Sequence, residues 1–184
     1  PNHKLNISYF SEIVKIINKL IFSFNETDFN IFNDRNNYNV EISENNFILF
    51  HFDEKWIHND YISSYVNIEP TEKELISFLN LLVDKSKKKV IVTTGVNHAS
   101  ILKKIFTKNF NSNITFFGNL NFLEIENIIG KCNILISCHG AVSHVASAKN
   151  IKQIDIIEKS NVNFYSRWTS HFRNYNCLYR SNFK

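Results

Sequence analysis

Hydrophobic residues follow two alternating patterns along this chain. Short continuous apolar runs are typical of strands that are buried on both faces, as in a parallel sheet. Between these runs, apolar residues recur at spacings of three and four, which predicts helices. The predicted strands cover residues 47–52, 90–94, 114–117, 134–136 and 154–157, and residues 177–179 could add a last short strand.

Two of the predicted helices carry a capping-box signature, in which a side chain at the helix start and a glutamate three residues later satisfy free amides. Thr71 with Glu74 opens one helix, and Asn121 with Glu124 opens another, for which Gly130 fits the C-terminal stop. Further helices are predicted over residues 98–108 and from about residue 142.

Strands that alternate with helices at this spacing predict an α/β fold with a doubly wound, mostly parallel sheet of Rossmann-like type. Such sheets bind ligands at the carboxyl ends of their strands, near the switch in strand order. The chain has neither a GxGxxG sequence after its first strand nor a GxxxxGK[ST] sequence. A nicotinamide or flavin dinucleotide site and a P-loop are therefore not expected.

The N-terminal quarter differs from the rest of the chain. Residues 7–23 show helical periodicity, and an Asn-rich connector with a short extended piece around residues 38–42 follows up to residue 46. We expect residues 1–45 to form an interdomain helix and connector, and residues 46–184 to form the Rossmann-like domain. Because the chain starts at Pro1 and has no Met, we expect it to be part of a longer protein.

Composition and charge limit the classes of binding partner that we expect for this chain. The 184 residues are 43% hydrophobic with a net charge of +4, and the densest basic run, Lys85–Lys89, fits the end of a helix. No arginine–aromatic interleaving accompanies it, so nucleic acid is not an expected partner. Three cysteines without a CxxC pair indicate free thiols in a reducing, cytoplasmic setting and no metal site. No apolar run is long enough to span a membrane, and no signal peptide is present.

The stretch from residue 133 to residue 149 carries the clearest candidate chemistry. A strand that turns sharply into a small-residue helix directs free amides and a partial positive charge above the sheet, which suits a phosphate or diphosphate. Small residues allow close approach and polar ones supply hydrogen bonds; the candidates are Ser137, His139, Gly140, Ala141, Ser143 and His144. The plainer alternative is an ordinary strand-to-helix turn whose histidines are polar loop residues.

This stretch resembles the C-terminal domain of family 9 glycosyltransferases, the heptosyltransferase-like enzymes. In that family a strand ends in Asp-Ser/Thr-Gly-x-x-His and runs into an Ala-rich helix. His144 falls on the motif histidine, and the segment from His139 to Ala141 falls on Asp-Ser/Thr-Gly, with the aspartate replaced by His139 and the glycine displaced by one position.

Two further segments are similar to the family. Lys55-Trp56 resembles a loop whose lysine binds the donor phosphate, although Trp56 is more simply explained by packing. The strand that ends in Thr94 and Gly95 resembles one followed by an acid that contacts the donor nucleoside, but Asn97 stands there instead. Separately, an acid at a strand end often binds a ribose hydroxyl, which makes Glu158 a candidate.

The resemblance implies one half of a two-domain GT-B glycosyltransferase, with a nucleotide-diphosphate sugar as donor and a glycan or glycolipid as acceptor. It implies metal-independent transfer in cell-surface polysaccharide or lipopolysaccharide synthesis, without a cofactor, in the cytoplasm and with peripheral association at the inner face of the membrane. The catalytic base would belong to an N-terminal domain that precedes this chain. Two alternatives stay open: a GT-B-like sugar-nucleotide epimerase or hydrolase, and a degenerate domain with a scaffold or interaction role.

Overall fold

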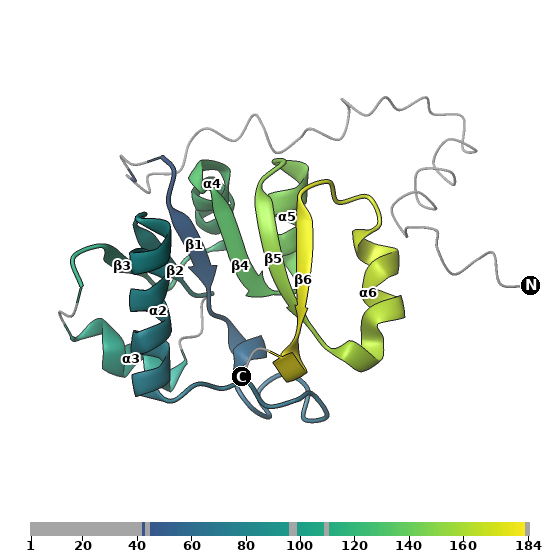
Figure 1. The fold of residues 1–184 in the computed structure, drawn as a ribbon, viewed down its shortest axis with the longest axis horizontal. Helices are drawn as coiled ribbons and strands as arrows, with labels where there is room; N and C mark the ends of the chain where they lie inside the picture. The colour runs from purple at the N-terminus through teal and green to yellow at the C-terminus, as the bar shows by residue number, and fades with distance from the viewer. Residues whose placement is uncertain (1–41, 43–44, 96–98, 109–110, 183–184) are drawn as a thin grey trace, which may run out of the picture.

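The computed structural model describes residue 42 and residues 45–95, 99–108 and 111–182 (Figure 1). Six strands form one sheet in the order β3-β2-β1-β4-β5-β6, and every neighbouring pair is parallel. The predicted α/β class and parallel, doubly wound sheet are confirmed. The strands are β1 (Ile48–His51), β2 (Val90–Thr93), β3 (Ile114–Phe117), β4 (Ile134–Cys138), β5 (Lys152–Ile157) and β6 (Tyr175–Tyr179).

The continuous apolar runs reflect a sheet with a packed layer on each face. In β1, Ile48 and Phe50 belong to one buried cluster and Leu49 belongs to the other. Because successive side chains of a strand point to opposite faces, a strand between two layers must be apolar at every position. The first cluster packs under α2 (Glu72–Ser86) and α3 (Ser100–Phe106), and the second under α4 (Phe122–Lys131) and α5 (Ala141–Ala148).

Both predicted capping boxes are present. Thr71 accepts from the amide of Glu74 while the Glu74 carboxylate accepts from the amide of Thr71, and Asn121 and Glu124 repeat this exchange at α4. The basic run after residue 85 lies at the end of α2, as expected. Gly130 differs from the prediction, because it lies inside α4, which ends one residue later at Lys131. There, Gly130 makes room for the Lys149 side chain, 3.4 Å from the position of an added Cβ.

The aromatic and basic region that follows β5 is folded, and it includes the last short strand expected around residues 177–179. It forms a short 3₁₀ turn (Lys159–Asn161), then α6 (Val162–Thr169), the edge strand β6 and a last 3₁₀ turn (Arg180–Asn182). In Figure 1, α6 lies beside the β6 edge of the sheet. This arrangement brings aromatic side chains of α6 to the carboxyl ends of β4 and β5.

Some expectations fall outside the described residues. They are the helix over residues 7–23, most of the connector that follows it, and Asn97. The division into residues 1–45 and 46–184 therefore stays a prediction. Within the described ranges, no helix combines the length and the apolarity needed to cross a membrane.

The strand order places a switch point between β1 and β4. The chain leaves β1 toward β2 on one side and leaves β4 toward β5 on the other. Loops that depart in opposite directions leave a crevice above the carboxyl ends of the two strands, where open α/β sheets bind ligands.

Candidate functional site

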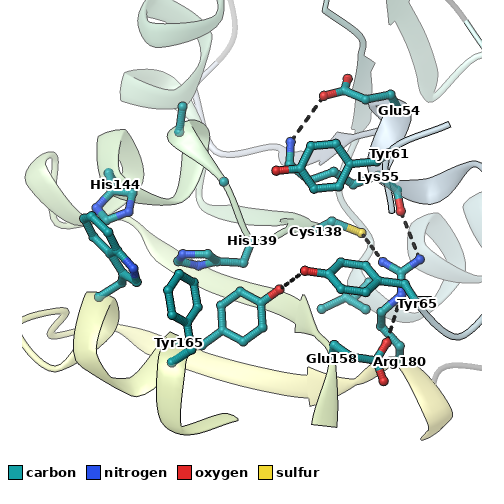
Figure 2. Close-up of a pocket in the computed structure, with 15 residues that line it drawn as sticks. Glu54, Lys55, Tyr61, Tyr65, Cys138, His139, His144, Glu158, Tyr165 and Arg180 are labelled. Atoms are coloured by element: carbon teal, nitrogen blue, oxygen red, sulfur yellow. Dashed lines mark hydrogen bonds and ion pairs between the residues drawn. The ribbon is translucent and has the colours of Figure 1, made fainter. Parts of the chain in front are cut away.

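A cavity of about 420 Å³ opens at this switch point (Figure 2). Its walls come from the carboxyl ends of β4 and β5, from the start of α5, from α6, from the loop after β1 and from the turn after β6. The lining residues are Glu54, Lys55, Tyr61, Tyr65, Cys138, His139, Gly140, Ala141, His144, Ile156, Glu158, Phe164, Tyr165, Trp168 and Arg180. Cations, acids and aromatic rings therefore meet in one space.

The β4–α5 turn forms one wall. β4 ends at Cys138, and α5 begins at Ala141 after two turn residues. The Ser143 hydroxyl accepts from the amide of Gly140, and the Ser143 amide donates back to the Gly140 carbonyl. Ser143 is buried and holds the turn from behind, so the start of α5 faces the cavity through Gly140 and Ala141.

Lys55 approaches this turn from across the switch point. It belongs to a 3₁₀ turn (Glu54–Trp56) that Asp53 caps, and its Nζ lies 2.6 Å from Oδ2 of Asp53 and 3.6 Å from Oε1 of Glu54. Burial alone lowers the pKa of Lys55, but the charge of Asp53 and its hydrogen bond outweigh burial and raise the pKa above its usual value. The ammonium is therefore charged, and it also lies over the ring of Tyr61.

His139 stands at the centre of the cavity wall. Its Nδ1 lies 2.7 Å from Oδ2 of Asp155, a β5 carboxylate with no exposed surface. The Ser137 hydroxyl donates to the other oxygen of Asp155 at 3.4 Å. Ser137 is thus a buried support and not part of the lining. The ring is fixed by a buried carboxylate while it borders an open space, which is an arrangement suited to proton transfer.

His144 has a different environment. Its ring packs edge-on against Trp168 and Phe172 and lies 5.5 Å from the ring of His139. Burial, together with the smaller effects of the neighbouring His139 and His171, lowers the pKa of His144 to about 4. His144 is therefore neutral near pH 7 and offers a hydrogen bond but no charge.

Arg180 closes the cavity from the side of β6. It is buried, and it donates to the backbone carbonyls of Lys55 and Val66 and to Sγ of Cys138. Glu158 accepts from the amide of Val66 and lies 3.8 Å from the Arg180 guanidinium. A hydrogen bond between the hydroxyls of Tyr65 and Tyr165 also joins the loop after β1 to α6. These contacts hold the loop after β1 onto the sheet edge.

The sequence-predicted residues separate into three groups. The cavity brings together Lys55, His139, Gly140, Ala141, His144 and Glu158. Ser137 and Ser143 lie just behind it, where Ser137 bonds Asp155 of β5 and Ser143 bonds the lining residue Gly140. Thr94 and Gly95 directly follow β2, on the far side of β1, and do not line this cavity. Trp56 is buried and donates to the His51 carbonyl, which fits the packing role expected for it.

Several lining residues were not singled out from the sequence as site residues: Tyr61, Tyr65, Tyr165, Trp168 and Arg180. Asp155 behind the lining was also missed, although a carboxylate inside the apolar run of residues 154–157 is an available signal, because such a residue must be paired when buried. Arg180 gave no such signal, since the atoms that accept its hydrogen bonds belong to residues more than 40 positions away in sequence.

Metal ligation and cysteine chemistry find little support in the part of the chain that the structure describes. No cluster of three or more His, Cys, Asp or Glu side chains there has the arrangement to hold a metal ion. The thiols of Cys132, Cys138 and Cys177 are all free, and the first two are buried.

Comparison with known proteins shows the fold. A solved structure of UDP-GlcNAc 2-epimerase from Methanocaldococcus jannaschii, in complex with UDP-GlcNAc and UDP, matches 74% of this chain with a TM-score of 0.50 at 12% identity. Another structure of that epimerase matches the same share with a TM-score of 0.48 at 11% identity. This chain spans about a third of their length (35%). No protein-family model and no curated protein sequence matches it.

Proposed function

We propose that this chain is the donor-binding half of a glycosyltransferase that uses a nucleotide-diphosphate sugar. The observation that carries the proposal is the placement of the Lys55 ammonium against Gly140, at the first turn of α5 and inside the switch-point cavity. The first amides of a helix have no intrahelical acceptor, and together with a fixed cation they suit the charge that gathers on a departing diphosphate.

The remaining lining fits the rest of such a donor. Tyr61 and Phe164 are about half exposed at the cavity, and the ring of Trp168 lies beside that of Phe164 in the wall. Aromatic faces of this kind stack on nucleobases and on apolar faces of sugars. The fold is shared with an epimerase that was solved with UDP-GlcNAc and UDP, and this likeness supports a nucleotide-sugar ligand.

The proposal extends to the whole enzyme. A second α/β half would supply the base that deprotonates a hydroxyl of a glycan or glycolipid acceptor, in cell-surface polysaccharide or lipopolysaccharide synthesis at the cytoplasmic side of the membrane. Transfer would need no metal, because Lys55 and the α5 amides supply the positive charge. Nucleotide-sugar affinity should accordingly be the same in excess EDTA as in excess Mg²⁺.

Calorimetric titration of the full chain with UDP, ADP, GDP and dTDP sugars tests the proposal. We expect one nucleotide class to bind, Lys55→Ala to weaken that binding about tenfold or more, and His144→Ala to weaken it less. Lys108→Ala is the matched control, because Lys108 pairs with Glu72 on the outer surface of α2 and α3. If no class binds, or if Lys55→Ala and His144→Ala both bind like wild type, the proposed site is wrong.

A sugar-nucleotide epimerase is the second candidate, favoured by the fold that this chain shares with the epimerase. The two functions differ in their products. Incubation of the complete protein with a nucleotide sugar and no acceptor would yield an epimer, or free sugar in the case of a hydrolase. A transferase would leave the donor unchanged until an acceptor is added.

A further inference from the structure

We propose that His139 donates a proton to the diphosphate oxygen that leaves the sugar, and that Asp155 is the positioning residue that holds the proton-bearing ring; this inference rests on the proposed function. His139 directly follows β4, and its amide donates to the Ile156 carbonyl of the adjacent strand β5, in which Asp155 lies. The edge of the sheet therefore holds both residues in place, as a group that must meet a reacting oxygen requires.

The hydrogen-bond pattern decides which nitrogen serves the ligand. Asp155 faces Nδ1, so Nδ1 carries a hydrogen that it donates to the carboxylate. Nε2 is the nitrogen left for a group in the cavity that His139 lines. The Asp155 carboxylate stabilises the positive charge of an imidazolium, in which Nε2 is also a donor.

His144, the second histidine of the cavity, does not suit the role of proton donor. His144 lies beside His139, but its partners are aromatic rings and other histidines, with no carboxylate among the contacts of the described residues that surround it. One ring is bonded to a buried carboxylate and the other packs among aromatic rings, so the acid and neutral roles divide between the two histidines. His139 is the proton carrier, and His144 is a neutral hydrogen-bonding group.

The charged side chains around the cavity explain why a bound diphosphate favours protonation of His139. The groups that face His139 are Asp155 from β5, His144 from α5 and Tyr165 from α6. Across the cavity, the cations Lys55 and Arg180 are matched by the acids Glu54 and Glu158, with Asp53 buried behind Lys55. Because acids offset both cations, a diphosphate with two negative charges is favoured by the additional positive charge that protonation of His139 brings.

The proposed step balances as follows. The bond between the anomeric carbon and the diphosphate oxygen breaks, and its electron pair stays on that oxygen. The hydrogen on Nε2 of His139 moves to the same oxygen, which leaves a neutral imidazole still bonded to Asp155. The anomeric carbon forms its new bond to the acceptor hydroxyl oxygen, whose proton goes to a base and then to solvent. Solvent returns a proton to Nε2.

Proton uptake on donor binding is the test, because it needs no turnover. A nucleotide sugar is the probe, since its diphosphate diester does not titrate near neutral pH, unlike a free nucleoside diphosphate. Calorimetry of the full chain in buffers of low and high ionisation enthalpy counts the protons taken up. We expect proton uptake by wild type, affinity that falls as the pH rises, and loss of both effects in His139→Gln and Asp155→Asn.

Two further variants separate the histidines. His144→Gln should bind more weakly but keep the uptake, and His58→Gln, at an exposed loop histidine, should match wild type. Because Asp155 is fully buried, its variant could misfold, so ring NMR of histidine-labelled wild type provides a second measurement. The resonance that His139→Gln removes should change to that of an imidazolium when donor is added.

The outcomes distinguish the two proposals. Donor binding without proton uptake, uptake that persists in His139→Gln, or an unchanged His139 ring signal would overturn this inference and leave the donor site standing. Failure of wild type to bind any nucleotide sugar would overturn the proposed function, and this inference with it.

Discussion

The Lys55 ammonium lies so close to Gly140 that a methyl group added to that glycine would stand 3.1 Å from Nζ and 3.2 Å from Cε. The backbone of Gly140 is extended, with φ near −178°, a conformation that any residue adopts. Glycine is therefore needed here for space and not for backbone freedom. The atoms that an alanine would meet are the end of a flexible side chain, which can move away.

This geometry predicts that Gly140→Ala weakens donor binding but leaves the stability of the fold nearly unchanged. The free energy of unfolding should change by less than about 0.5 kcal/mol, because only the tip of Lys55 must shift. Nucleotide-sugar affinity should fall by about tenfold, because the ammonium moves away from the first turn of α5. Urea unfolding and calorimetric titration measure the two quantities.

Gly130→Ala is the matched control for that experiment. Its Cβ would make ordinary contact with the Lys149 side chain, 3.4 Å away in the α4–α5 layer and outside the cavity lining. A helical glycine replaced by alanine should gain about 0.5–1 kcal/mol of stability and leave donor binding unchanged. Equal affinity of Gly140→Ala and wild type would mean that Lys55 does not act from its observed position.

Arg180 provides a prediction about stability. Removing it leaves Glu158 buried without its cation and leaves the carbonyls of Lys55 and Val66 without a donor. Arg180→Ala should therefore cost about 3–5 kcal/mol in the free energy of unfolding, and Arg180→Lys should restore only part, because an ammonium cannot reproduce the spread of the guanidinium donors. Urea denaturation followed by circular dichroism measures both.

Arg173, an exposed residue shortly before β6, offers the comparison. Arg173→Ala should change the free energy of unfolding by less than about 0.5 kcal/mol, as is usual for surface positions. If Arg180→Ala proved as mild as Arg173→Ala, the closure of the loop after β1 would not depend on this side chain.

The strands and the capped helices could be predicted from the sequence because their signals are local. A run such as residues 47–52 is apolar at every position because both faces of β1 are covered, and Thr71 with Glu74 closes its capping box within four residues. The cavity edge formed by Lys55 and the β4–α5 turn could also be predicted, since both follow strands of a parallel sheet.

The other half of the cavity could not be predicted, because it depends on distant contacts. Arg180 acts through Lys55 and Val66, and Tyr165 bonds Tyr65 across 100 residues of chain. Neither relationship has a sequence spacing that local chemistry would explain. The pair of His139 and Asp155 depends on the register of β4 against β5, in which Ser137 stands opposite Asp155. That register follows from packing and not from either strand alone.

The cysteines predict a labelling pattern. Burial raises the pKa of the Cys132 thiol to about 12 and raises that of Cys138 as well, and the thiolate is the reactive form. Cys177 is exposed on the edge strand, and its pKa is raised less by burial. In the native chain an alkylating reagent should therefore modify Cys177 alone, as measured by mass spectrometry of the intact protein.

Denaturation supplies the internal control for that pattern. In urea all three thiols should react, because none is in a disulfide in the described structure. Cys177→Ser should then leave the native chain unlabelled. Rapid labelling of Cys138 in the native chain would contradict the closed contact between its sulfur and Arg180.

The buried ring of His144 makes the free energy of unfolding depend on pH. Its pKa is about 4 in the folded chain and near 6.5 when exposed, mainly because burial disfavours the charged ring. As pH falls from about 6.5 toward 4, the unfolded chain takes up a proton that the folded chain does not, so the free energy of unfolding falls over that window. Burial also lowers the pKa of His51 and His171, and both add to the same slope.

His144→Gln should reduce this slope without abolishing it, since His51 and His171 remain. The measurement is the midpoint of urea unfolding from about pH 7 to pH 4. His58→Gln is the comparison, because the His58 side chain is exposed and its replacement removes no buried ring. An unchanged slope in His144→Gln would mean that its ring is already hydrated in the folded chain. In that case the ring could not be the neutral neighbour that leaves the proton to His139.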